Sequence, residues 1–278
     1  MIRPSVIKRF RAFTGLVAVA AFVAASPAFA RAADQPVLLY SQYLNAPGEN
    51  RYPVDGNYRP AMEGLDQEFD IRVDAEPLTA ERLAGVKVLL IVNPNQSAHQ
   101  TNPPPHRLSA EEGIALYNWI YAGGGLILMG NQENHNLEID SINQHLLRLV
   151  GLKWVNRYTD AKRLVLPPDL PIVGGLAWAY YTGNLVEVTP HHPAKARSLV
   201  ENDLTQKPAM GPRDEPGSLL AIAEVGAGRI AVVTDSGWLA NWALGGQGVG
   251  GVAIKEQDNL EIMLRLTRWV AGINPVRD

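Results

Sequence analysis

The chain contains no cysteine. Disulfides, a lipid-modified cysteine anchor and a cysteine nucleophile are therefore all excluded. The sequence also lacks the Gly-x-Ser-x-Gly elbow of many serine hydrolases. Its histidines and carboxylates follow no His-Glu-x-x-His or other zinc-binding spacing, and the glycine-rich stretch 245–251 lacks the Gly-Lys-Ser/Thr of a phosphate loop. No common signature of nucleophilic, metal-dependent or nucleotide chemistry is present, and we expect no cofactor.

The first thirty residues have the features of an export signal. Lys8, Arg9 and Arg11 precede an apolar run over residues 12–25, and residues 28–30 (AFA) fit a small-x-small cleavage site. We expect a Sec-type signal peptide over residues 1–30, cleavage after Ala30, and a periplasmic or secreted protein. An uncleaved membrane anchor is the alternative.

Basic side chains are scarce in the remainder of the chain. Residues 1–30 carry four basic residues and no acidic one, so residues 31–278 hold 21 basic and 28 acidic side chains, a net charge of −7. This balance argues against nucleic acid or anionic lipid as the main partner, because no basic stripe is present to displace counterions. A length of 248 residues suits one α/β domain with an elaboration. A cysteine-free exported protein of this size fits a bacterial periplasm.

The central stretch, residues 86–129, predicts a strand, a helix and a strand. Residues 86–92 (VKVLLIV) and 126–129 (LILM) are apolar runs typical of strands buried on both faces of a parallel sheet. Between them, Ser109 and Glu112 have the spacing of a capping box, and a glycine triplet at 123–125 ends the helix. Such a unit forms a right-handed βαβ crossover. We therefore predict an α/β flavodoxin-like three-layer sandwich with a mostly parallel central sheet.

The remaining segments predict how this unit is extended. Residues 36–40 and 70–73 suit strands, 60–69 and 139–150 suit helices, and 219–234 suit an antiparallel hairpin. We expect Asp258 to cap the last helix. Residues 153–217 are rich in proline and predict an irregular, β-rich insertion of edge strands or a small subdomain. Residues 31–278 would then form one domain with an insertion at about 153–217.

Small polar residues follow several of the predicted strands. In open parallel sheets, ligands bind outside the carboxyl ends of the strands, and amides and carboxylates suit hydroxyl-rich ligands. The same residue types also populate turns and helix caps for purely local reasons, which is the competing interpretation. The candidate ligand-binding residues are Ser41, Asn93, Asn95, Asn131, Glu133, Asn134, Asp235, Ser236, Asn241, Asp258 and Asn259.

Two other interpretations stay open. A hydrolase could use Ser236, or a pair of carboxylates among Glu133, Asp235 and Asp258, which glycoside chemistry would need about 5–10 Å apart. The aromatic stretch 178–181 (WAYY) could stack on sugar rings, pack in the core or at an edge, or form an exposed apolar patch in a purely structural protein.

The order of these pieces resembles the class I glutamine-amidotransferase-like superfamily. It is most similar to the branch that contains GldG-type gliding and transport proteins, related intraflagellar-transport domains and many exported bacterial proteins of unknown function. The matching stretches are residues 88–94 (VLLIVNP), 108–112 (LSAEE), 123–130 (GGGLILMG), 192–193 (HP) and 228–236 (GRIAVVTDS), with Asn241, Asp258 and Asn259.

The resemblance implies a non-catalytic role. True amidotransferases carry a cysteine on the sharp turn after a central strand, and residues 130–132 (GNQ) stand at the matching turn here. Members of this branch bind ligands or serve in assemblies. We therefore expect an exported domain that binds a polar ligand, for example a glycan, or a protein partner in the cell envelope.

Overall fold

The computed structural model describes residues 35–94, 103–131, 139–206, 213–247 and 253–273. The described residues belong to one compact unit. The helices are α1 (Arg59–Leu65), α2 (Ala110–Tyr121), α3 (Asp140–His145), α4 (Asn241–Leu244) and α5 (Asn259–Val270), with 3₁₀ turns η2 (Leu147–Val150) and η3 (Gly237–Leu239). The strands are β1 (Val37–Ser41), β2 (Asp70–Asp74), β3 (Val86–Val92), β4 (Gly125–Met129), β5 (Leu152–Thr159), β6 (Lys162–Val165), β7 (Ala177–Tyr180), β8 (Gly183–Val188), β9 (Arg197–Glu201), β10 (Ser218–Val225) and β11 (Gly228–Val233).

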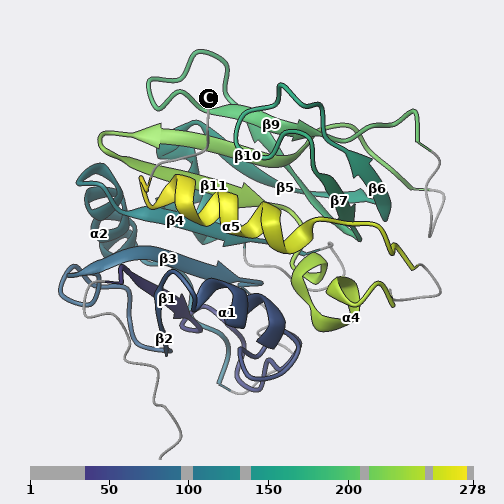
Figure 1. Cartoon of the computed structure of the whole chain (residues 1–278). Coiled ribbons are helices and arrows are strands. Elements are labelled where there is room, and N and C mark those ends of the chain that lie inside the picture. Colours follow the sequence, from purple (N-terminus) through teal and green to yellow (C-terminus); the bar gives the residue numbers. More distant parts are fainter. Residues whose placement is uncertain (1–34, 95–102, 132–138, 207–212, 248–252, 274–278) are drawn as a thin grey trace, which may run out of the picture. The chain divides into compact units, whose positions relative to one another are not determined.

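Nine of the strands in the described residues form one mixed sheet (Figure 1). Its order is β2-β1-β3-β4-β11-β10-β8-β5, with β9 also paired to β10. The five strands from β2 to β11 are mutually parallel. Their succession is the flavodoxin-like order 2-1-3-4-5, in which the direction of winding reverses between β1 and β3. The predicted α/β, flavodoxin-like class is therefore confirmed.

Alternate side chains of the parallel strands enter two separate cores. On one face, residues such as Leu90 pack with α1 and α5, which lie in front of the sheet in Figure 1. On the opposite face, their neighbours such as Leu89 pack with α2 and α3. Because successive side chains of a strand point to opposite faces, continuous apolar runs are what a sheet covered on both sides requires. This gives the three predicted layers.

The insertion joins the same sheet. Strands β5, β8 and β9 extend it by antiparallel pairing, while β6 and β7 pair with each other in a separate two-stranded sheet. The hairpin of β10 and β11 also forms as predicted. The sheet changes from parallel to antiparallel pairing at this hairpin, because β11 is parallel to β4 and β10 is antiparallel to β11.

The helix ends show one correct and one wrong expectation. The Ser109 side chain accepts a hydrogen bond from the Glu112 backbone N–H, and the Glu112 carboxylate accepts one from Ser109, so the capping box is confirmed. Helix α5 begins directly after Asp258, but the carboxylate of Asp258 makes no cap hydrogen bond. It accepts a hydrogen bond from the backbone N–H of Ala177 at the start of β7 instead. The expectation that Asp258 caps the last helix is therefore wrong, because a strand end competes for its oxygens.

Two predicted helices are shorter than expected. Helix α1 ends at Leu65, and the chain reaches Phe69 through hydrogen-bonded turns. The segment 139–150 divides into α3 and η2, and Gly151 ends it in the left-handed conformation. Within the described residues, no helix is both long and apolar enough to cross a membrane.

Candidate functional site

Four of the predicted residues lie at the carboxyl ends of adjacent strands. Asn93 directly follows β3, Asn131 lies two residues after the end of β4, and Asp235 and Ser236 follow β11. All four are buried, with at most 2% of the residue surface exposed. Asn93 adopts a φ of 51°, a left-handed conformation that asparagine tolerates better than most residues. The sequence-based grouping of these side chains at one edge of the sheet is therefore reproduced.

The loop between β1 and α1 covers this edge. The Asn131 amide donates to the Tyr52 hydroxyl at 3.0 Å, and the Asn93 amide donates to the Glu49 carboxylate at 3.1 Å. The Tyr58 hydroxyl donates to the carbonyl oxygen of Ser236. Asn131, which follows β4, is thus hydrogen-bonded to a side chain of the chain's own loop.

Asp235 is the most strongly perturbed acid at this edge. One carboxylate oxygen accepts the backbone N–H of Tyr181 at 2.9 Å, and the other accepts that of Gly237 at 2.6 Å. Burial raises its pKa to about 7, although these N–H donors oppose the rise. Burial also raises the pKa of Tyr52 and Tyr58, and the nearby Asp235 charge adds to the rise.

Ser236 does not have the surroundings of a nucleophile. The residue has no exposed surface, and its hydroxyl donates to the carbonyl oxygen of Gly130. That bond ties the end of β11 to the turn after β4. The hydroxyl therefore serves the backbone, and this geometry argues against a serine hydrolase.

Asp258 and Asn259 lie apart from Asp235. Asp258 accepts the N–H of Ala177 at 2.8 Å, whereas Asp235 accepts that of Tyr181. Four residues of extended chain separate these two contacts, or about 13 Å at roughly 3.3 Å per residue. The two carboxylates thus bind backbone N–H groups at the start of β7 and directly after its end.

The amide of Asn259 is fully engaged with the backbone. Its oxygen accepts the N–H of Ala179, and its nitrogen donates to the carbonyl oxygens of Ala179 and Trp238. It thereby fixes β7 and η3 to the start of α5. This is the local, structural role that competed with ligand binding in the sequence interpretation.

The remaining predicted residues are scattered. Ser41 is buried and its hydroxyl accepts the N–H of Tyr43 at 3.3 Å. Asn241 is exposed and borders a separate hollow of about 470 Å³ with residues of the loop 50–60. Three predicted residues lie outside the described part of the chain, namely Asn95, Glu133 and Asn134.

The aromatic side chains of residues 178–181, with Trp154 and Trp238, belong to the cores. Trp154, Trp178 and Trp238 are at most 1% exposed, and the rings of Trp178 and Trp238 meet edge to face at 5.5 Å. Tyr180 and Tyr181 are equally buried. The packing interpretation of residues 178–181 is confirmed, and both a sugar-stacking surface and an exposed apolar patch there are wrong.

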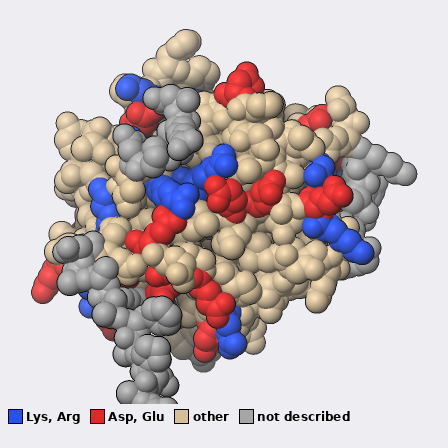
Figure 2. All heavy atoms as spheres, in the orientation of Figure 1, with Lys and Arg blue, Asp and Glu red and all other residues tan. Residues whose placement is uncertain are grey.

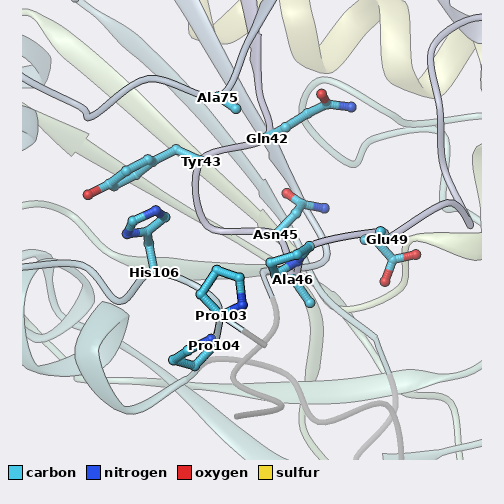
Figure 3. A pocket seen from close by; sticks show the side chains of 11 residues that line it. Gln42, Tyr43, Asn45, Ala46, Glu49, Ala75, Pro103, Pro104 and His106 are labelled. Atoms are coloured by element: carbon cyan, nitrogen blue, oxygen red, sulfur yellow. The ribbon is translucent and has the colours of Figure 1, made fainter. Parts of the chain in front are cut away.

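An open cavity lies one strand away from the covered edge, where the winding direction reverses. It has a volume of about 340 Å³ and lies beside the loops that follow β1, β2 and β3 (Figure 3). In open α/β sheets this switch point is the usual ligand site. The described lining residues are Gln42, Tyr43, Asn45, Ala46, Pro47, Gly48, Glu49, Ala75, Pro103, Pro104 and His106.

The cavity wall combines rings, amides and one ion pair. The rings of Tyr43 and His106 stack at 4.5 Å with an interplanar angle of 15°. Asn45 donates to the carbonyl oxygen of Val92 at 3.2 Å, which attaches the loop to the end of β3. The carboxylate of Glu49 accepts several hydrogen bonds from the Arg51 guanidinium.

The chemistry of Tyr43 reflects this environment. Burial raises its pKa to about 12, and the neighbouring Glu112 carboxylate contributes to the rise. The phenol is therefore neutral at ordinary pH and acts as a hydrogen-bonding ring rather than an acid. No group of three or more metal-binding side chains occurs among the residues with described positions. Among the described lining residues there is no serine, threonine, cysteine or lysine.

The sequence indicates polar residues from Ser41 to Asn45 after the first strand, but it does not predict the cavity that they border. The stretch between the first strand and Tyr58 is polar and carries glycine and proline, which is typical of a loop. The available signal was that loops after the first and third strands face each other whenever the strand order is 2-1-3. That order is a tertiary property, so the loop alone could not reveal it.

Comparisons with known proteins give the fold but no family. No family model and no curated protein matches the chain. Solved structures similar to it include the mmIFT52 N-terminal domain, with TM-score 0.62 and 17% identity over 84% of this chain and 97% of that one. They also include the cytoplasmic protein STM3548 from Salmonella typhimurium, with TM-score 0.51 and 12% identity over 84% and 98%.

ThuA-like proteins are also among the similar structures. One from Bacteroides uniformis has TM-score 0.49 and 12% identity, over 86% of this chain and 93% of that chain. At such identities the likeness concerns the fold alone.

Proposed function

We propose that this protein is an exported, non-catalytic binding domain that holds a small polar ligand in the cavity at the β1/β3 switch point. The observation that carries the proposal is the contrast between two neighbouring places. At the end of β4, where an amidotransferase nucleophile would stand, Asn131 is buried beneath Tyr52. Next to it, a cavity of about 340 Å³ lined by amides and stacked rings stays open.

A hydroxyl-rich ligand such as a glycan fits this wall better than a nucleotide. An amide group such as that of Gln42 offers both a donor and an acceptor, which is what hydroxyls use. No arginine or lysine is among the described lining residues, so a phosphate group would find no cation there.

The surface charge supports the same class of ligand. On the face seen in Figure 2, basic and acidic side chains lie close together rather than in a large patch of one sign. This fits the expectation that nucleic acid is not the partner. We further propose that the protein belongs to the GldG-type and intraflagellar-transport-like branch, on the order of its sequence motifs and on its likeness in fold to the mmIFT52 domain.

Binding is tested with a panel of mono- and oligosaccharides and envelope extract fractions, monitored by thermal unfolding. The proposal predicts that at least one ligand raises Tm, and that Tyr43→Ala removes this rise without lowering the Tm of the free protein by a comparable amount. Tyr121→Ala, an exposed tyrosine on α2, is the matched control and should bind normally. Absence of any stabilising ligand, or equal effects of the two variants, would reject the cavity as the site.

Two further measurements address export and catalysis. Amino-terminal sequencing of the protein recovered from a bacterial host should begin at residue 31 if the signal is cleaved after Ala30. A bound ligand should be recovered chemically unchanged after long incubation, because the described lining residues include no serine, threonine, cysteine or lysine. Release of a hydrolysis product that Ser236→Ala abolishes would establish the hydrolase alternative instead.

A further inference from the structure

The wall of the cavity contains a buried amide oxygen that lacks a hydrogen-bond donor. Asn45 contributes to its wall, and the amide nitrogen of Asn45 is committed to the carbonyl oxygen of Val92. The amide oxygen of Asn45 is buried and accepts no hydrogen bond from the described residues. The amide oxygen of Asn93, directly after β3, is likewise buried and accepts no hydrogen bond from the described residues.

A buried acceptor without a donor costs free energy, and the cost is removed by whatever supplies a donor. The terminal amide torsion of asparagine is broad, so a modest turn of Asn45 can present its oxygen to a molecule in the cavity. Figure 3 shows this side chain between the ring wall and Glu49. The site therefore favours molecules that bring hydroxyl or amino hydrogens.

The charge of the cavity wall distinguishes neutral hydroxyl donors from charged amino donors. Glu49 is the one carboxylate among the described lining residues, and its side chain is 8% exposed. The Arg51 guanidinium already neutralises it, and the Asn93 amide donates to it as well. A cation gains little from a carboxylate that is already paired, and an anion meets that carboxylate with no uncommitted arginine or lysine in the wall.

We propose that this cavity selects neutral, hydroxyl-rich molecules, that Asn45 is a specificity-determining acceptor, and that the Glu49–Arg51 pair excludes charged ligands. This inference rests on the proposed function and specifies its ligand class. It also gives the ion pair a role that can be reversed. Glu49→Gln leaves the Arg51 charge without a carboxylate partner, so the variant should accept anions that the natural chain rejects.

The experiment uses matched sugars that differ only in charge. Glucose, glucuronate and glucosamine form one set, and galactose, galacturonate and galactosamine form another. Dissociation constants are measured by calorimetry at pH 7 for the natural chain and for Glu49→Gln. Glu63→Gln, an exposed carboxylate on α1, is the control with the same change in charge.

In at least one set the neutral sugar should bind the natural chain at least about fivefold more tightly than its acid or its amine, a difference of about 1 kcal/mol. Glu49→Gln should shift the preference toward the acid by a similar factor, and Glu63→Gln should leave the order unchanged. Asn45→Ala should weaken neutral-sugar binding several-fold, whereas Asn50→Ala, an exposed asparagine outside this cavity, should not.

The outcomes separate the two proposals. Tighter binding of the acid or amine by the natural chain overturns the charge selection while the binding function stands. An unchanged order in Glu49→Gln overturns the role of the ion pair. If no member of either set binds while another ligand stabilises the protein through Tyr43, neutral-sugar selection is wrong. If no ligand stabilises the protein at all, the proposed function itself fails.

Discussion

Ionisation of Asp235 should make the stability of this protein depend on pH in an unusual direction. Its carboxyl group is buried and its pKa rises from 3.8 to about 7 in the folded chain. An acid with a raised folded pKa stabilises the fold through its protonated form. That contribution is fully present below the unfolded value near 4 and is lost as the pH rises through 7.

The magnitude follows from the rise of about three in pKa, at about 1.4 kcal/mol per unit. Between pH 4 and pH 8 the free energy of unfolding should therefore fall by about 4 kcal/mol because of this one group. Typical domains have only 5–15 kcal/mol in total. The effect is large enough to measure by urea unfolding at a series of pH values.

Asp235→Asn isolates the effect, because asparagine does not titrate. The variant loses some stability at every pH, since its amide nitrogen must face either the Tyr181 or the Gly237 N–H. The informative quantity is the natural chain's free energy of unfolding minus that of the variant. This difference should fall by about 4 kcal/mol from pH 4 to pH 8.

The opposite slope would refute the reasoning. Backbone N–H donors stabilise a carboxylate, and two or three of them can hold an aspartate pKa far below its usual value. If those donors outweigh burial at Asp235, the difference rises with pH. A flat difference would mean that the two effects cancel and that the buried acid does not control stability.

Three further predictions concern the free energy of unfolding measured by denaturant titration. Gly130→Ala should cost at least about 1–3 kcal/mol, because a methyl group there would lie 2.0 Å from the Trp154 ring; a neutral result would mean that the ring moves freely. Lys162→Met should cost about 3–5 kcal/mol, since it strands the buried partner carboxylate of Asp214; a cost below about 1 kcal/mol, typical of surface pairs, would contradict this. Ser109→Ala should cost about 1 kcal/mol through the lost capping box, and an unchanged stability would show that the helix end does not depend on it.

The sequence by itself determined the layers of this fold. Apolar runs such as 86–92 cannot be exposed on either face, so they predict a covered parallel sheet, and the capping box at Ser109 fixes where α2 begins. These signals are local in the chain. Because each signal depends only on neighbouring residues in the chain, the predicted strands and the start of α2 are found in the structure.

Local signals were ambiguous for the polar residues at the strand ends. Asn93, Asn131 and Asp235 do meet at one edge, as the strand pattern implies. Asn259 and Asp258 show the other outcome, in which the same residue types bind the backbone of β7. The same residue type can line a ligand site or bind the backbone. Only its neighbours in the folded chain decide which groups it contacts.

Tertiary structure alone decided where a ligand could bind. The loop that carries Tyr52 folds over the end of β4, and the loops after β1 and β3 leave the neighbouring cavity open. Both results depend on the strand order 2-1-3, which brings Asn45 to the end of a strand that follows it by some forty residues. Hydrogen bonds between segments so distant in sequence are set by packing, and no pattern within either segment encodes them.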